Sequence, residues 1–68
     1  MDKDLLEYEL KKRKITVNEV CEKIGLSRSA FYRKCNGITE FTLSEINKIV
    51  DIIGFESAIP IFFASSVS

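Results

Sequence analysis

Apolar residues recur at helical spacing in several short segments of this chain of 68 residues. Leu6 and Leu10 lie four residues apart and predict a first helix over residues 4–14, with its acidic residues early and its basic residues late, as the helix dipole favours. Stripes at i, i+3, i+4 and i+7 predict helices over 17–24 and 43–53, formed by Val17, Val20, Cys21 and Ile24 and by Ile46, Ile49, Val50 and Ile53. Residues 28–35 form one more predicted helix. Four short helices predict an all-α globule, and a coiled coil is excluded because no heptad repeat persists.

Residues with a capping function stand at the predicted helix starts. Thr16 precedes Glu19 by three positions, and Thr42 precedes Glu45 by three, which is the spacing of a capping box. Ser27 is a suitable N-cap for the helix that follows it. These local signals predict where three of the helices begin.

A glycine turn joins the second and third predicted helices. Gly25 stands at the end of the second helix, where a left-handed backbone costs glycine least. Two short helices joined in this way form a helix-turn-helix unit, here over residues 16–37. Such a unit commonly places its second helix in the major groove of DNA.

The second helix of this unit carries donors suited to DNA. Ala30 and Phe31 supply its inward face, which leaves Arg28, Ser29 and Arg33 on the outer face as predicted base-contacting residues. Arginine can donate two hydrogen bonds to guanine, and such a pair discriminates against a wrong base by about 1–3 kcal/mol. The outer face therefore predicts direct reading of base edges.

Further residues are candidates for weaker DNA contacts. Ser27, Tyr32 and Lys34 lie on the same helix or at its cap, although Ser27 also serves as an N-cap and Tyr32 has packing against a neighbouring helix as an alternative. Bare backbone donors predict phosphate anchors at Thr16 and Val17 and in the loop at Asn36 and Gly37. The basic run 11–14 fits a solvated helix end.

The charge is unevenly distributed, although the net charge is zero. Residues 11–34 hold eight basic and two acidic residues, a local charge of +6, whereas 1–10 and 35–68 each carry −3. A local positive field attracts phosphate regardless of the neutral total. The charge pattern therefore agrees with DNA binding through the middle of the chain.

The tail over 56–68 permits two structures. Ile59, Ile61 and Phe63 alternate as in a strand, while a short helix over 57–63 would accept Pro60 in its first turn. The tail either closes the core of its own domain or pairs with a second copy. The second alternative predicts a homodimer interface formed by Ile59, Ile61, Phe62 and Phe63.

Size and composition limit the remaining possibilities. A chain of this length predicts one domain over residues 1–68. It has no histidine, and its two cysteines, Cys21 and Cys35, do not make a tetrahedral zinc site, so we expect no metal, no cofactor and no enzymatic activity. Reduced thiols, a charged N-terminus and the absence of a long apolar run predict a cytoplasmic protein without a membrane segment.

The stretch TVNEVCEKIGLSRSAFYRKCNG resembles the helix-turn-helix of the phage Cro/repressor class, also called the xenobiotic-response-element type. The wider run SRSAFYRKCNGITEFTLSEINKIVDIIG is similar to small regulators of temperate phages and prophages of Gram-positive bacteria. This resemblance implies a λ-repressor-like domain of four to five helices, and it implies base contacts at Arg28, Ser29 and Arg33. Val17 departs from the family, which often has glutamine there, and Cys21 replaces the usual alanine.

Two functional hypotheses follow from these observations. The first is a sequence-specific transcription regulator of a phage or prophage switch that occupies a double-stranded operator as a homodimer, with no small-molecule substrate. The alternative is an antirepressor-type modulator that binds a second phage repressor protein instead of DNA, which the neutral net charge and the apolar tail favour.

Overall fold

The computed structural model describes residues 1–63, and this part of the chain folds into five α-helices without a β-strand. The helices are α1 (Lys3–Lys12), α2 (Val17–Ile24), α3 (Arg28–Cys35), α4 (Leu43–Ile53) and α5 (Phe55–Phe62). The all-α prediction is confirmed, and α2 and α3 have the predicted bounds. None of the described helices combines the length and apolar character needed to cross a membrane.

The predicted caps form. The Thr16 hydroxyl accepts a hydrogen bond from the Glu19 backbone N–H at 3.2 Å, and the Glu19 carboxylate accepts one from the Thr16 backbone N–H at 3.1 Å. Thr42 and Glu45 make the equivalent capping box at the start of α4. Ser27 Oγ accepts from the Ala30 N–H at 3.1 Å. Each cap pairs N–H groups that a helix start leaves unpaired.

Helix α1 begins one residue earlier and ends two residues earlier than predicted. Its C-terminus closes in a Schellman motif, in which the Ile15 N–H bonds to the Leu10 carbonyl at 2.9 Å and the Lys14 N–H bonds to the Lys11 carbonyl at 3.0 Å. Lys14 takes the left-handed position of this motif, with φ +58°. Because a lysine holds that position instead of glycine, the sequence carried no stop signal there.

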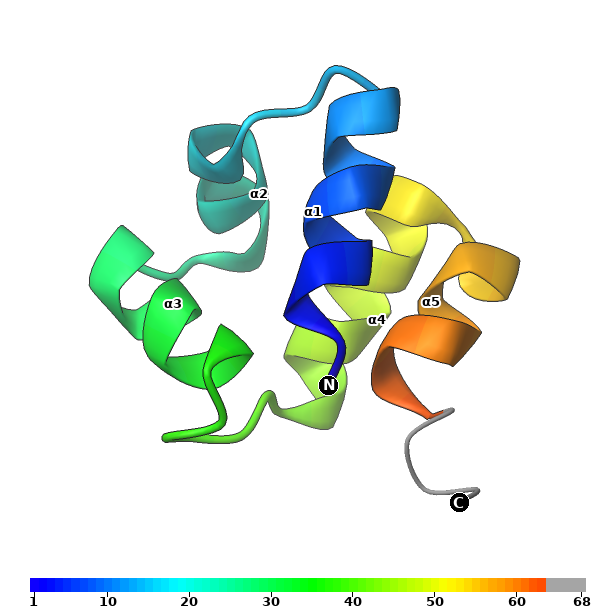
Figure 1. The fold of residues 1–68 in the computed structure, drawn as a ribbon. Helices are drawn as coiled ribbons and strands as arrows, with labels where there is room; N and C mark the ends of the chain where they lie inside the picture. The colour runs from blue at the N-terminus through cyan, green and yellow to red at the C-terminus, as the bar shows by residue number, and fades with distance from the viewer. Residues whose placement is uncertain (64–68) are drawn as a thin grey trace.

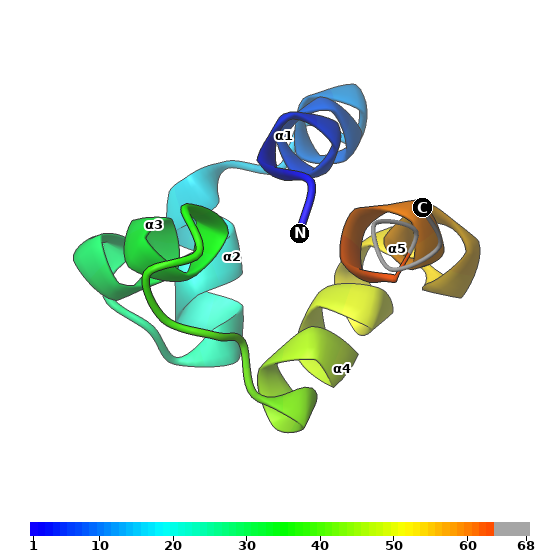
Figure 2. The same ribbon diagram turned by 60° about the horizontal axis from the view of Figure 1, so that its bottom comes forward.

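The five helices surround one hydrophobic core (Figures 1 and 2). Helix α4 packs against α2 and α5, and α1 packs against α5. In Figure 1, α3 and α5 lie on opposite sides of the molecule, with α1 and α4 between them. The buried apolar residues are Leu6, Leu10, Val20, Cys21, Ile24, Phe31, Cys35, Ile49, Ile53, Ala58 and Ile61. In this arrangement the described part of the tail, which ends at residue 63, lies away from α3.

The first part of the tail is helical, so the strand alternative is wrong for the described residues. Ala58 and Ile61 are fully buried at i, i+3 spacing, and Phe62 packs edge-on against Phe41 with ring centroids 5.7 Å apart. Because α5 starts at Phe55, Pro60 lies beyond its first turn and not within it, as the prediction had it. Residues 64–68 of the predicted tail lie outside the described residues.

This packing corrects the predicted dimer interface. Ile61 has no exposed surface, so it is a core residue and is not available to a second copy. Phe62 is half-buried against the core, while Ile59 and Phe63 retain 40% and 46% exposure. Ile59 and Phe63, four residues apart, lie on the outer side of the helix, and Ile61 between them faces the core. In the sequence this helical arrangement gives the same alternation that a strand would give.

Candidate nucleic-acid interface

The outer side of α3 presents the three predicted base-contacting residues. Arg28, Ser29 and Arg33 are all exposed, whereas Phe31 and Cys35 of the same helix are buried. At about 100° per residue, Arg28 and Arg33 project about 140° apart with Ser29 between them. The two guanidinium groups therefore border one open face, as the sequence predicted.

The turn before α3 fixes the orientation of this face. Gly25 has φ +79°, and the Leu26 N–H bonds to the Cys21 carbonyl at 3.0 Å, which closes the end of α2. The Ser27 hydroxyl is used in the helix cap, so its capping role has geometric support and its DNA contact remains a prediction. Phe31, edge-on to Phe41 at 6.0 Å, anchors α3 to the core.

Tyr32 projects between Arg28 and Ser29, within the arc of the open face. It is half-buried, with its ring edge-on to Phe31 at a centroid distance of 5.7 Å. The Lys3 ammonium lies 5.8 Å from the Tyr32 ring centroid and 3.5 Å from Asn36 Oδ1. Sequence reasoning missed Lys3, because no local signal connects the first turn of α1 with the end of α3.

Lys34 is turned toward the body of the protein. Its ammonium donates to the Glu40 carbonyl at 2.9 Å and pairs with the Glu45 carboxylate at 3.0 Å, with only 14% of its side chain exposed. These contacts tie the end of α3 to the loop and to the start of α4. The prediction of Lys34 as a DNA contact is therefore corrected, since its donor group is committed to the fold.

Some of the donors predicted to bind a phosphate at the start of α2 are already used within the protein. The Glu19 carboxylate already accepts from the Thr16 backbone N–H and hydroxyl, both at 3.1 Å. The backbone donors at Val17 and Asn18 are the ones that the capping box leaves for an external acceptor. Since the side chain of Val17 is apolar, a phosphate contact there depends on its backbone, and Asn18 is an exposed polar neighbour.

The anchor predicted at the exit of α3 has no backbone donor to offer. The Asn36 N–H bonds to the Tyr32 carbonyl at 2.9 Å, and the Gly37 N–H bonds to the Lys34 carbonyl at 3.2 Å. The second bond belongs to a Schellman motif in which Gly37 has φ +81° and the Ile38 N–H bonds to the Arg33 carbonyl at 3.0 Å. Gly37 is thus corrected from anchor to turn residue, and Asn36 retains only its side-chain amide as a donor.

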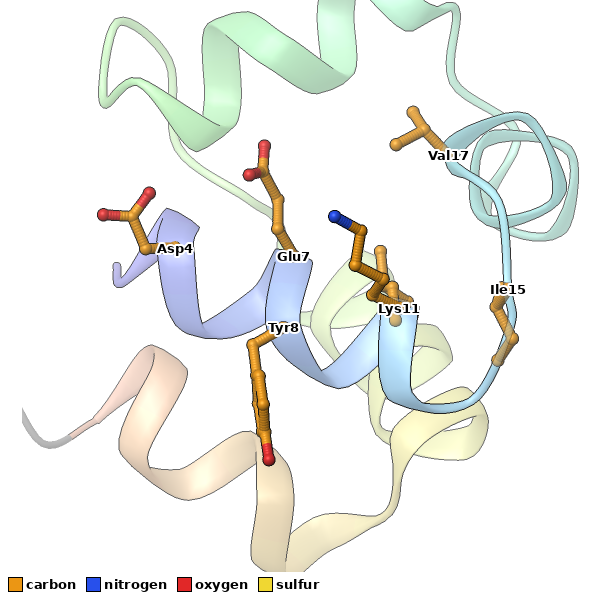
Figure 3. A pocket seen from close by; sticks show the side chains of 7 residues that line it. Asp4, Glu7, Tyr8, Lys11, Ile15 and Val17 are labelled. Atoms are coloured by element: carbon orange, nitrogen blue, oxygen red, sulfur yellow. The ribbon is translucent and has the colours of Figure 1, made fainter.

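A shallow groove of about 510 Å³ lies between α1 and the start of α2 (Figure 3). Its lining residues are Asp4, Glu7, Tyr8, Leu10, Lys11, Ile15 and Val17. In Figure 3 the Glu7 side chain points toward α3, whereas Tyr8 points the other way, toward α5. The groove mixes opposite charges with apolar walls and holds none of the predicted base-contacting residues.

The model of the Cro/C1-type helix-turn-helix DNA-binding domain matches residues 4–56. The chain belongs to this family. The match includes α1 except its first residue, all of α2 to α4 and the whole helix-turn-helix unit, so the resemblance inferred from residues 16–37 is confirmed. As a Cro/C1-type domain, the chain has the fold of DNA-binding transcriptional regulators.

Among curated proteins, the Cro/C1-type chain is similar to a UPF0735 ACT domain-containing protein of Carboxydothermus hydrogenoformans. The two are 43% identical over 42 residues, which are 62% of this chain and 29% of that protein. The chain thus spans less than a third of the relative's length, and the similarity concerns that segment alone. No solved structure matches the chain.

Proposed function

We propose that this Cro/C1-type protein is a sequence-specific regulator of transcription that acts in a phage or prophage switch by occupying an operator. The observation that carries this proposal is the exposed face of α3 between Arg28 and Arg33. The caps and the core fix this helix, and the side chains of Arg28, Ser29 and Arg33 remain exposed. Action on an operator implies a cytoplasmic protein, as the sequence predicts.

In this proposal α3 lies in the major groove and reads base edges. Arg28, in the first turn, and Arg33, one and a half turns later, each donate to guanine, and Ser29 between them reaches a base edge or a phosphate. The side-chain amide of Asn36 and the backbone donors at Val17 contact phosphates on either side. Ser27 and Tyr32 remain additional predicted contacts.

A second copy of the chain completes the proposed operator complex. Phe55 and Ile59 lie four residues apart on the outer side of α5, with 63% and 40% of their surfaces exposed, and Phe63 continues the same row. Such a stripe is a candidate isologous interface. This proposed interface differs from the one predicted from sequence, because it includes the exposed Phe55 and omits the buried Ile61. Two α3 helices would then lie about 34 Å apart along the DNA.

The same stripe favours a second candidate function. An antirepressor-type protein would use Phe55 and Ile59 to bind another repressor, and the zero net charge of the chain suits a protein partner. The two functions differ in salt dependence, because a complex through several phosphates weakens steeply with salt. An apolar contact with a repressor would change little over the same range.

Selection from random duplexes followed by anisotropy titration tests the proposal. Wild-type protein should enrich a defined site, and Arg28→Ala and Arg33→Ala should each weaken binding to that site by about 5- to 150-fold, which corresponds to about 1–3 kcal/mol. Lys48→Ala, which removes an exposed positive charge from α4, is the matched control and should retain wild-type specificity. Wild-type affinity in both arginine variants would refute readout by α3.

A further inference from the structure

We propose that Lys3 is a phosphate-contacting residue of the DNA interface, where it acts with the side chain of Asn36 and beside the ring of Tyr32. The inference rests on the proposed DNA-binding function and extends the interface from the helix-turn-helix unit to the first turn of α1. It rests on a juxtaposition of residues 33 positions apart in the chain, in which Lys3 Nζ lies 3.5 Å from Asn36 Oδ1.

The start of α1 is held in place at this position. The Asp2 N–H donates to the Ile61 carbonyl at 2.9 Å, and the Asp2 carboxylate accepts from the Leu5 N–H at 3.0 Å. The backbone on both sides of Lys3 is therefore tied to α5 and to the first turn of α1. The lysine is half-buried and directed toward the end of α3.

Among residues 1–63, Lys3 takes part in no ion pair. The ion pairs found there are Arg13–Glu9 and Lys34–Glu45. Burial raises the pKa of Cys35 to about 11; the charge of Lys3 opposes that rise and the carboxylate of Glu7 adds to it, so the field of this lysine reaches the last turn of α3 together with that of Glu7. A helix C-terminus carries partial negative charge that repels phosphate, and a cation placed there offsets it.

The donors left at this point suit a phosphate. The backbone N–H of Asn36 is used within the helix end, and its Oδ1 faces Lys3, which leaves the Nδ2 group as its outward donor. An ammonium and an amide side by side form a donor pair of the kind that binds DNA backbone oxygens. Lys3 thereby also orients the amide of Asn36.

The pair lies on the side of α3 that carries the arginines. Counted from Arg28 at about 100° per residue, Tyr32 projects at about 40° and Asn36 at about 80°, both within the arc that ends at Arg33. Lys3 approaches this arc from α1. A duplex that engages Arg28 and Arg33 would therefore have a backbone within reach of Lys3.

Salt dependence of binding distinguishes a phosphate contact from general electrostatics. We compare wild type and Lys3→Gln by anisotropy with a labelled random-sequence 20-bp duplex and with the selected site, between about 50 and 200 mM NaCl. The matched control is Lys12→Gln, which removes the same charge from the opposite side of the same helix. Lys12 Nζ lies over the ring of Tyr8, which points toward α5 (Figure 3).

Lys3→Gln should make the negative slope of log K against log salt shallower by about 0.9, the value for one phosphate. It should also weaken binding to both duplexes by the same factor. Lys12→Gln should leave the slope unchanged. A double variant with Asn36→Ala should lose less than the sum of the two single effects. Unchanged far-ultraviolet circular dichroism confirms that the variants are folded.

Each remaining outcome has one meaning. A wild-type slope in Lys3→Gln, or an equal decrease in Lys12→Gln, overturns the assignment of Lys3 while the DNA-binding function stands. Loss of binding to the selected site alone would mean that Lys3 reads a base, which also contradicts the proposal. Wild-type protein that binds neither duplex refutes the proposed function itself.

Discussion

Arg13 reaches from the end of α1 to the corner between α4 and α5, where its Nη2 donates to the Ile53 carbonyl at 2.8 Å. The same nitrogen lies 3.2 Å from Ser57 Oγ, and Nη1 pairs with the Glu9 carboxylate. Ile53 is the last residue of α4, so its carbonyl has no partner within that helix. One guanidinium thus joins three helices.

Replacing Arg13 should destabilise the domain. Arg13→Gln leaves the Ile53 carbonyl without its partner, and an unsatisfied group of this kind costs about 1–3 kcal/mol. We expect the midpoint of urea unfolding, followed by circular dichroism, to fall accordingly. Arg13→Lys should recover only part of the loss, because an ammonium does not reproduce the two-sided geometry of the guanidinium.

Lys12→Gln provides the control for the Arg13 variants, since it removes a neighbouring positive charge that lies on the surface. Its free energy of unfolding should stay within about 0.5 kcal/mol of that of the wild type. Equal stability of Arg13→Gln and Lys12→Gln would show that the guanidinium contacts contribute nothing.

Stability should also decline in acid. The hydrogen bond from Arg13 lowers the pKa of Glu9 below 4.5, against the opposing effect of burial. Burial raises the pKa of Glu45, but hydrogen bonds from Thr42 and Lys34 outweigh it and lower the pKa overall. Because both folded-state pKa values lie below those of the unfolded chain, their stabilisation is complete well above pH 4.5 and is lost as the pH falls through the folded-state values.

Urea midpoints measured from pH 7 down to pH 3 test this expectation. The wild-type midpoint should be level down to about pH 5 and then decrease. Glu9→Gln should be less stable at neutral pH and show a shallower decrease in acid. A variant curve parallel to wild type across the acid range would exclude Glu9 as a source of the pH dependence.

The elements that sequence predicted correctly are those fixed by neighbours in the chain. The caps at Thr16, Ser27 and Thr42 and the turn at Gly25 need only residues within one helical turn, so α2 and α3 were predicted to the residue. The open face of α3 followed from the same information, because helical geometry decides which side chains share a face once the inward residue Phe31 is known.

The contacts that sequence missed join residues far apart. Arg13 and Ile53 are 40 positions apart, and Lys3 and Asn36 are 33 apart, so no local pattern reports either pair. Lys34 was predicted as a DNA contact because lysine commonly binds phosphate. Only the position of Glu45 in the folded chain shows that the Lys34 ammonium forms an ion pair within the protein. The basic run 11–14 was interpreted as a solvated end for the same reason, although Arg13 is part of the fold.

The left-handed residue at the end of α1 offers a stabilising substitution. Lys14 has φ +58°, a conformation that costs a residue with a Cβ atom about 1–2 kcal/mol and glycine almost nothing. After the entropy lost by glycine on folding, Lys14→Gly should raise the free energy of unfolding by about 0.5–1 kcal/mol. Urea unfolding at neutral pH measures the gain.

Gly25→Ala is the reverse of that substitution. A Cβ atom at Gly25 meets nothing within 4 Å, so its cost arises from the backbone conformation at φ +79° and not from a clash. We expect a loss of about 1 kcal/mol. If Lys14→Gly destabilises the protein as much as Gly25→Ala does, the left-handed strain inferred at Lys14 is absent.

The two thiols should be protected as long as the protein is folded. Burial raises the pKa of Cys21 and raises that of Cys35 to about 11, compared with 9.0 for an exposed thiol. At pH 8 the thiolate fraction of Cys35 is then about 100-fold lower than that of an unperturbed thiol, and its burial also blocks the reagent. Reaction with a disulfide reagent should be slow in native buffer and should proceed at once, with two equivalents, in guanidinium.

Ser29→Cys places a third thiol on the exposed face of α3 and should react immediately with one equivalent. Rapid labelling of the wild-type protein in native buffer would mean that the interface between α2 and α3, which holds both cysteines, opens far more often than its packing implies.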